Sequence, residues 1–269
     1  MNERRPCGFT LVELLIVVAI IGVLFAILFS VFATAPEKAR RISCLSNEKQ
    51  LAIAFAQYEQ ESDEQYPNGS VRRTGWEPPS EAPPSGEGWA GQIYPYVKST
   101  AVFECPNDPT PAAPPAQRVS YGYNNWLLAP ADISAVPGRV LSTPRTVLLY
   151  ETTGNTAQIT QPDEGAAQGA RQFSAAGDGG LLISAPGGST GAALCATGWM
   201  GRFDSQKHSY DQFPDQNGRH AGGANYVLTD GHVKWLQPDR VLCVIHPKLS
   251  DAEFDGYDAW FENRNYRRR

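Results

Sequence analysis

The strongest hydrophobic signal in the chain is a continuous apolar run from Phe9 to Ala33, in which Glu13 is the one ionisable side chain. The 25 residues of this run span roughly 37 Å as a helix, enough to cross a hydrocarbon core of about 30 Å with some tilt. We therefore predict a transmembrane helix over residues 9–35.

After Pro36 the apolar positions thin out to one stripe on an otherwise charged segment. Spacings of seven, four and three residues place the members of this stripe on one face of a helix. Residues 36–64 are thus predicted to form the amphipathic half of a single long helix, and the stripe is predicted to pack against a globular head of residues 65–269. The stripe consists of Cys44, Leu51, Phe55 and Tyr58.

Prolines dominate the next segment, since residues 66–115 hold eleven of the 21 in the chain. Such a segment forms neither a long helix nor a central strand. We expect an extended loop that wraps the head, with GWAGQIYPYV as a short helix or turn. VFECPNDP is interpreted as a short strand that ends at Cys105 and is followed by a turn.

Two further strands are predicted from Ser120 (SYGYNNWL) and from Thr146 (TVLLYE), because aromatic and β-branched residues are frequent in both. Residues 165–201 contain ten glycines and one short apolar patch. This composition indicates a long surface loop or insertion with room for one strand.

The segment GGANYVLTDGHVKWLQ carries the best hairpin signal of the chain. Residues 225–229 and 232–236 flank the dipeptide Asp230-Gly231, which favours a two-residue type I′ turn with positive φ at both positions. We expect this to be the central hairpin of an antiparallel sheet. The predicted fold class is α+β: a long N-terminal helix, half in the membrane, packed on an antiparallel β-sheet head with long loops.

Charge narrows the range of functions. Charged residues make up 19% of the chain and its net charge is −5, which argues against general nucleic-acid binding. The arginines of residues 264–269 are interpreted as a solvated basic tail. Because no Ser-His-Asp order, phosphate-binding loop or pair of helical carboxylates is present, we predict neither an enzyme nor a cofactor.

Cysteines suggest a disulfide-bonded head. Cys7 lies close to the N-terminus, and the other four are Cys44, Cys105, Cys195 and Cys243. An even number permits two disulfides in an extracytoplasmic domain, and none of the spacings is typical of a zinc site. The sequence leaves the connectivity open. We expect Cys44 to pair with Cys105, which ends a short strand where the Pro-rich loop must be tied down, and Cys195 to pair with Cys243.

The N-terminus adds a specific resemblance. A short basic leader ends at Gly8 and is followed by FTLVELLIVVAIIGVL, an arrangement that resembles the type IV prepilin (class III) signal of pilins and type II secretion pseudopilins. The resemblance implies that a prepilin peptidase removes residues 1–8 and that the Phe9 amine is methylated. It also implies that Glu13 pairs with the amine of a neighbouring subunit, because a carboxylate in hydrocarbon costs about 2.5–3.5 kcal/mol. The alternative is an interfacial Glu13 solvated by lipid headgroups.

A second resemblance rests on motifs near both ends of the chain and at several points between, but on none in residues 165–201. His220 is followed by nine residues and then Asp230-Gly231. Together with SCLSNEKQLA, VFECPND and SYGYN, this spacing resembles the prepilin-type, processing-associated H-x9-DG family, whose domain has no known function. The resemblance implies a pilin-like subunit of a type IV pilus or type II secretion-like system, single-pass in the bacterial inner membrane with its head extracytoplasmic. Its partners would be prepilin peptidase, other pilin-like subunits and membrane lipid. The alternative is a membrane-anchored extracytoplasmic binding module.

His220 and Asp230 admit two interpretations. We expect a structural role for them and for Gly231, in which His220 caps or hydrogen-bonds the hairpin. The competing hypothesis is a metal or acid/base site that includes His232. Asp215 and Asn217 are weak calcium candidates, because the regular oxygen-ligand spacing is absent. No metal is predicted.

Overall fold

The computed structural model describes residues 10–67, 88–112, 114–124, 127, 144–161, 194–198, 217–242 and 258–260 of the 269. They fall into two compact units, Met1–Ala39 and Arg40–Arg269, which are treated separately below. The elements in chain order are α1 (Leu11–Glu61), α2 (Trp89–Val97), η1 (Thr100–Phe103), β1 (Gln117–Arg118), β2 (Tyr121–Tyr123), β3 (Val147–Thr153), β4 (Thr156–Ala157), β5 (Leu194–Cys195), β6 (Ala224–Leu228), β7 (Val233–Leu236), η5 (Pro238–Arg240), β8 (Val241–Leu242) and β9 (Ala259–Trp260).

The first unit contains the apolar part of α1. The stretch Leu11–Phe29 has a mean hydropathy of 3.1 and none of it is buried. Its length and composition suit a membrane span. The helix is continuous through Pro36 and ends at Glu61.

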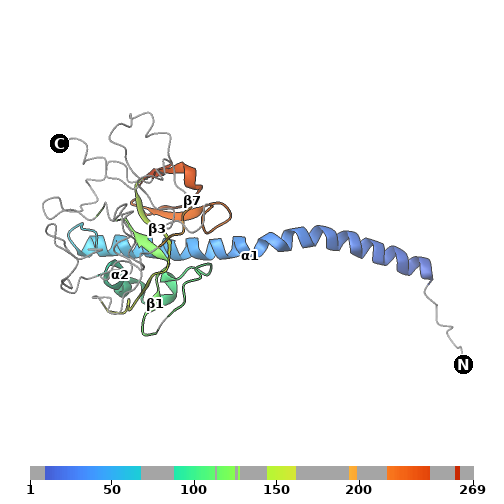
Figure 1. Ribbon diagram of the computed structural model, residues 1–269, viewed down its shortest axis with the longest axis horizontal. Coiled ribbons are helices and arrows are strands. Elements are labelled where there is room, and N and C mark those ends of the chain that lie inside the picture. Colours follow the sequence, from blue (N-terminus) through green and yellow to red (C-terminus); the bar gives the residue numbers. More distant parts are fainter. Residues whose placement is uncertain are drawn as a thin grey trace, which may run out of the picture. The chain divides into compact units, whose positions relative to one another are not determined.

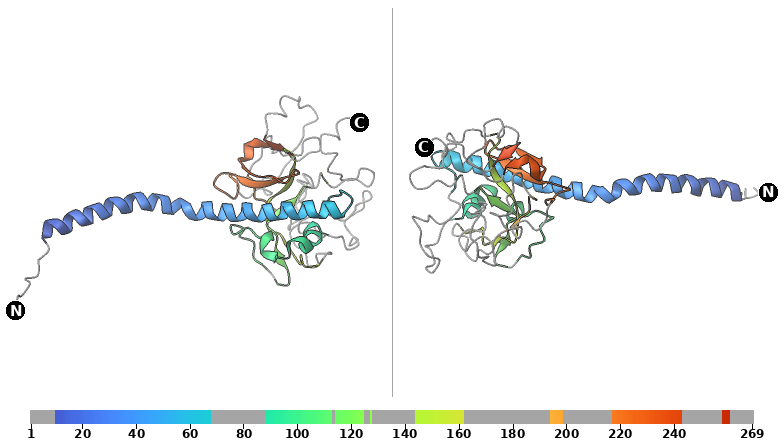
Figure 2. Two further views of the ribbon diagram at one scale, coloured as in Figure 1. Left: turned by 180° about the vertical axis from the view of Figure 1, so that it is seen from behind. Right: turned by 45° about the horizontal axis from the view of Figure 1, so that its top comes forward.

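In the second unit, the amphipathic half of α1 forms the spine of the head. The predicted apolar stripe is buried, with Cys44 and Leu51 wholly inaccessible and Phe55 1% exposed, while Tyr58 packs at the edge of the core. Figures 1 and 2 show this half of the helix running between strands β6 and β7 on one side and α2 and β1 on the other. The sequence pattern therefore identified the face of α1 on which the head is built.

The main sheet is antiparallel and follows the order β2-β3-β6-β7, with β5 also paired to β3. Both central strands, β3 and β6, are buried along almost their whole length. This explains the uninterrupted VLLY run of β3 and the YVL run of β6, since a strand that is covered on both faces does not alternate. Two small ribbons complete the described strands: β1 pairs with β4, and β8 pairs in parallel with β9.

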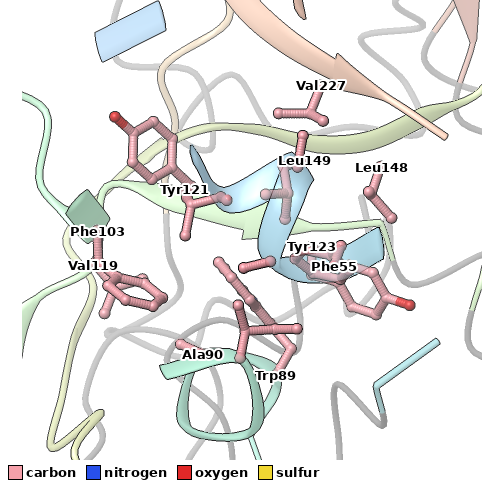
Figure 3. Close-up of a cluster of buried hydrophobic side chains, with 14 of the residues drawn as sticks. Phe55, Trp89, Ala90, Phe103, Val119, Tyr121, Tyr123, Leu148, Leu149 and Val227 are labelled. Carbon is pink, nitrogen blue, oxygen red and sulfur yellow. The ribbon is translucent and has the colours of Figure 1, made fainter. Parts of the chain in front are cut away.

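An aromatic core joins α1, α2 and the sheet. Trp89 at the start of α2 lies 5.5 Å from the Phe55 ring, 5.9 Å from Phe103 and 6.3 Å from Tyr123, measured between ring centroids. Figure 3 shows these rings meeting between the helix and the sheet. Aromatic pairs of this kind contribute about 0.5–1.5 kcal/mol each beyond the area they bury. The short helix expected in GWAGQIYPYV is thus present as α2.

Two sequence predictions about local structure are wrong. No strand forms at VFEC: Val102 and Phe103 end the 3-10 helix η1, and Glu104 and Cys105 follow it in extended or turn conformation. Val102 and Phe103 are adjacent and both buried, and a short helical turn can place both on the core side. The hairpin of β6 and β7 is not central, since β7 is the last strand of the main path. It is nevertheless fixed to the spine, because Lys49 Nζ of α1 donates a hydrogen bond to Gly231 O at 2.8 Å.

The hairpin turn also differs from the prediction. Val227 faces Val233, and the Gly231 amide donates to Leu228 O at 2.8 Å. Gly231 has φ +79°, whereas Asp230 is not among the positive-φ residues. The turn is therefore a three-residue loop with one left-handed glycine rather than a type I′ pair, a known alternative for this composition. Asp230 contributes through its side chain, whose Oδ1 accepts from the His232 amide at 3.0 Å.

Several expectations lie outside the described residues. They include the leader and cleavage site at Gly8 and Phe9, residues 68–87 of the Pro-rich loop, most of residues 165–201, Cys243, Asp215 and the basic tail. The pairing of Cys195 with Cys243 stays a prediction. Cys195 itself ends β5, which pairs with β3 and supplies a strand near the end of the Gly-rich region.

Candidate functional site

The first candidate feature is the start of α1. Glu13 Oε2 accepts hydrogen bonds from the Thr10 amide at 2.9 Å and from Thr10 Oγ1 at 2.7 Å, while the Glu13 amide donates to Thr10 Oγ1 at 3.2 Å. This reciprocal arrangement is a capping box, which satisfies amides that the first helical turn leaves without partners. The Glu13 carboxylate is thereby held at the N-terminal end of the apolar helix.

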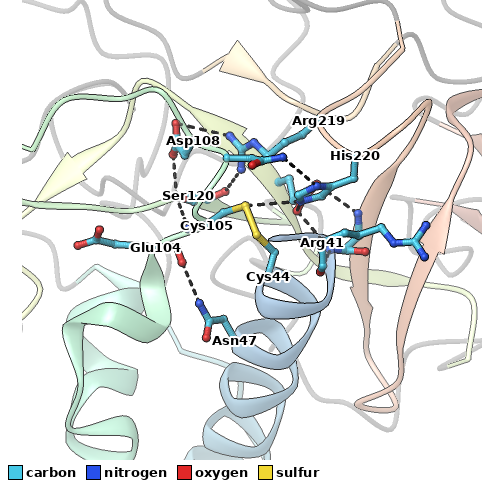
Figure 4. The surroundings of a disulfide bond; sticks show 12 residues. Arg41, Cys44, Asn47, Glu104, Cys105, Asp108, Ser120, Arg219 and His220 are labelled. Carbon is cyan, nitrogen blue, oxygen red and sulfur yellow. Dashed lines mark hydrogen bonds and ion pairs between the residues drawn. A yellow bond between two sulfur atoms is a disulfide. The ribbon is translucent and has the colours of Figure 1, made fainter. Parts of the chain in front are cut away.

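The second candidate feature is a buried polar cluster around a disulfide (Figure 4). Cys44 of α1 is bonded to Cys105, which follows η1, with a Cα–Cα distance of 5.0 Å. This is the bond expected from the sequence. The two positions are 61 residues apart, and closing a loop of that length contributes about 4 kcal/mol in the chain-entropy model. Both cysteines are wholly buried.

His220 lies directly against this disulfide and is also wholly buried. Its Nε2 is 2.8 Å from Glu151 Oε1 on β3 and 3.5 Å from Cys105 Sγ. On the other side of the ring, Asn107 Nδ2 is 3.5 Å from Nδ1. Glu151 accepts a further bond from the Asn225 amide of β6 at 3.2 Å. A buried carboxylate is tolerated when hydrogen bonds surround it in this way.

Arg219, the residue before His220, makes a buried ion pair. Its Nη2 is 3.6 Å from Asp108 Oδ1, and the two side chains are 4% and 0% exposed. The guanidinium also donates to the carbonyl oxygens of Ser120 and Thr152, and Ser120 Oγ donates to Asp108 Oδ2 at 2.7 Å. The loop after η1, strands β2 and β3 and the turn before β6 are thus held together by charge-assisted hydrogen bonds.

Glu48 of α1 completes the cluster. It is wholly buried, and within the described part of the chain neither carboxylate oxygen has a hydrogen-bond partner. Burial raises the pKa of this carboxyl well above its ordinary value of 4.5, the negative charge of Glu151 raises it further, and Arg219 opposes both. Glu48 therefore keeps its proton to a higher pH than an exposed glutamate does.

The spacing of the H-x9-DG motif follows from this architecture. A tight turn follows His220, then come the five residues of β6, and Asp230-Gly231 forms the next turn. Five strand residues span about 17 Å, so His220 and Asp230 lie at opposite ends of β6. This separation excludes the single metal or acid/base site that would have joined them with His232. Asp230 pairs instead with the exposed His232, Oδ2 to Nδ1 at 2.8 Å.

The expected bond from His220 to the hairpin is made by its backbone. Trp235 Nε1 of β7 donates to His220 O at 2.9 Å, and the Trp235 ring lies 5.3 Å from the guanidinium carbon of Arg41 on α1. The imidazole points to Glu151 and the disulfide instead. Asn217, one of the two calcium candidates, precedes this turn, while Asp215 lies outside the described residues.

The side chains that could hold a metal are therefore not the ones that sequence spacing suggests. One ligand atom from each of four residues lies within 4.8 Å of the other three, and all four residues are buried: Cys44, Cys105, Glu151 and His220. In this structure the two sulfurs are bonded to each other.

Four residues of the cluster were not predicted from the sequence: Glu48, Glu151, Asp108 and Arg219. Only Glu48 has a local signal: it fills the seven-residue gap in the apolar stripe between Cys44 and Leu51, at the helical position where a buried residue belongs. The other three lie far apart in the chain.

Comparison with known protein families covers the first feature and part of the second. Residues 4–29 match the prokaryotic N-terminal methylation motif, and residues 33–179 match the family described as protein of unknown function (DUF1559). The chain belongs to the DUF1559 family. No curated protein and no solved structure was found to match it.

The two matches establish a prepilin-type protein with a class III signal, which is a pilin-like subunit processed by prepilin peptidase. Its single apolar N-terminal helix anchors it in a membrane with the head extracytoplasmic. The region matched to DUF1559 contains Cys44, Glu48, Cys105 and Glu151, and ends before His220.

Proposed function

We propose that this chain is a structural subunit of a type IV pilus or a type II secretion-like system, anchored in or assembled from the bacterial inner membrane. The observation that carries the proposal is the methylation motif over residues 4–29, which coincides with an unburied apolar helix that holds Glu13 in its first turn. Cleavage after Gly8 would make Phe9 the new N-terminus, and its charged amine would then be available to the Glu13 carboxylate of a neighbouring subunit.

We further propose that the head serves assembly or recognition rather than catalysis. The titratable groups of the polar cluster include Glu48, Glu151 and His220, all wholly buried, and the disulfide ties two of its segments together. Among the residues that the structure describes, these three side chains offer a large substrate no exposed surface. The burial of His220 favours a structural role for the H-x9-DG histidine.

Assembly is tested by producing the full chain together with prepilin peptidase and examining membrane and shear fractions by sedimentation and electron microscopy. Wild-type protein is expected in large assemblies or short filaments. The informative variant is Glu13→Gln, because glutamine preserves the capping box but removes the charge. It is expected to be processed normally and to stay dispersed in the membrane.

Two results distinguish the alternatives. A membrane-anchored binding module predicts that wild-type protein and Glu13→Gln are equally dispersed. Assemblies that form equally well from both proteins would show that the charge of Glu13 has no part in subunit contact.

A further inference from the structure

The buried cluster brings together a set of side chains that is unusual for a purely structural core. Cys44 comes from α1, Cys105 from the loop after η1, Glu151 from β3 and His220 from the turn before β6. Two sulfurs, an imidazole nitrogen and a carboxylate oxygen are the ligand types that zinc takes in proteins. Four segments distant in sequence thus present one ligand each to a common point.

The distances suit a tetrahedral ion once the sulfur–sulfur bond is absent. Zinc bond lengths imply separations of about 3.4–3.8 Å between ligand atoms. His220 Nε2 already lies 3.5 Å from Cys105 Sγ and 2.8 Å from Glu151 Oε1, and all four ligand atoms are within 4.8 Å of one another. Reduction of the disulfide releases the two sulfurs from covalent contact. Small side-chain rotations would then complete the site.

The neighbouring groups fit the protonation state that a metal requires. Coordination through Nε2 leaves the imidazole proton on Nδ1, which then needs an acceptor. Asn107 has its amide 3.5 Å from Nδ1, and rotating this amide by half a turn presents its oxygen to that proton.

The geometry points to a second state of this cluster, in which reduced Cys44 and Cys105 join His220 and Glu151 to bind one zinc-type divalent cation in place of the disulfide. Each thiol releases its proton on binding, so two protons leave for every cation bound. In the extracytoplasmic head, the two cysteines are reduced until the disulfide has formed. The cation would then hold the same segments together before oxidation, and it would link β3 and the turn before β6 to them directly.

The test uses the full chain in detergent, loaded with zinc alone. A phosphine reduces the disulfide: phosphorus takes one oxygen from water, and the two hydrogens go to the two sulfurs. We expect the oxidised protein to leave this cluster empty and the reduced protein to take up zinc in a one-to-one ratio. X-ray absorption of the zinc-loaded protein is expected to show two sulfur and two nitrogen or oxygen ligands, as the four residues dictate.

Variants identify the ligands and the supporting residue. Cys44→Ser is expected to lose the two-sulfur site, whereas Cys195→Ser, the matched control on β5, retains it. Asn107→Ala keeps all four ligands and is expected to weaken zinc binding about 10–100-fold, as loss of a group that orients a ligating histidine does.

Three results would overturn the inference. The first is that reduced wild-type protein binds no zinc. The second is a zinc coordination shell that lacks the mixture of sulfur and nitrogen or oxygen ligands. The third is zinc binding that is unchanged in Cys44→Ser. Because the absorption measurement is made on the wild-type chain, the inference can fail even if a variant does not fold.

Discussion

Glu48 occupies a position on α1 where the helical pattern calls for an apolar side chain. It is buried beside Glu151 and within electrostatic range of Arg219, and burial is the largest cause of its raised pKa. A glutamate in such a place stays protonated, because burying an unpaired carboxylate costs more free energy than keeping the carboxyl neutral. Its protonation is therefore part of the folding equilibrium.

This linkage predicts that stability falls as the pH rises. Below the ordinary pKa of 4.5 both the folded and the unfolded chain carry the proton, whereas above it the unfolded chain loses the proton more readily than the folded one. We expect Glu48→Gln to remove this loss, so that the variant becomes progressively more stable than wild type as the pH rises from 4.5. Thermal melts of both proteins over a pH series measure the difference.

Glu59 does not disturb that comparison. Burial raises its pKa to about 7, which gives the same sign of pH dependence but acts equally in both proteins. If the melting temperatures of Glu48→Gln and wild type differ by the same amount at every pH, then Glu48 ionises in the folded head as it does in the unfolded chain.

Two histidine–carboxylate pairs permit a matched test of burial. His220–Glu151 and His232–Asp230 have the same 2.8 Å contact, but the side chains of the first pair are 0% exposed and the His232 side chain is 72% exposed. We expect His220→Ala to cost about 3–5 kcal/mol, because it strands a buried carboxylate. His232→Ala is expected to cost less than about 1 kcal/mol. Denaturant unfolding of the full chain gives both values, and equal losses would contradict the assigned role of His220.

At the scale of elements, the most accurate predictions from the sequence concern helices and strands whose side-chain pattern alone determines their structure. The apolar stripe of α1 and the strands β2, β3, β6 and β7 follow from periodicity and β-branched or aromatic content. VFEC was misjudged because four residues are too few to distinguish a strand from a 3-10 turn. The Asp230-Gly231 turn was misjudged because the same dipeptide fits two loop lengths, and hydrogen bonding across the strands selects between them.

The observed turn makes a prediction that the expected turn does not. Gly231 has φ +79°, so Gly231→Ala is expected to cost about 1–2 kcal/mol, whereas Gly231→Asn costs less, because asparagine adopts this conformation more readily. Asp230→Gly is also expected to destabilise the head, since it loses the bond to the His232 amide.

Thermal denaturation of the three variants checks the turn. In a type I′ turn, Asp230 would itself have positive φ, and replacing it with glycine would relieve strain. A stabilising Asp230→Gly would therefore support the type I′ turn over the one observed.

For the whole molecule, the membrane helix and the α+β head could be predicted from sequence, but the cluster at the centre of the head could not. Asp108, Glu151 and Arg219 come from segments up to 111 positions apart in the printed numbering, and none of them follows a local motif. Helical periodicity predicts burial only for apolar side chains. A buried acid such as Glu48 therefore looks like a gap in the apolar stripe of α1. The partners that make such an acid tolerable appear only when the chain is folded.

The account as a whole requires that prepilin peptidase processes this chain, and the mass of the mature protein tests that requirement most directly. Intact-mass measurement is made on protein recovered from membranes of a bacterium that contains the peptidase, and of a matched strain that lacks it. The account predicts a chain that begins at Phe9 and carries one added methyl group in the first strain, and the uncut chain from Met1 in the second. A mature protein that still begins at Met1 in the presence of the peptidase, or that is cut beyond Ala33, would contradict it.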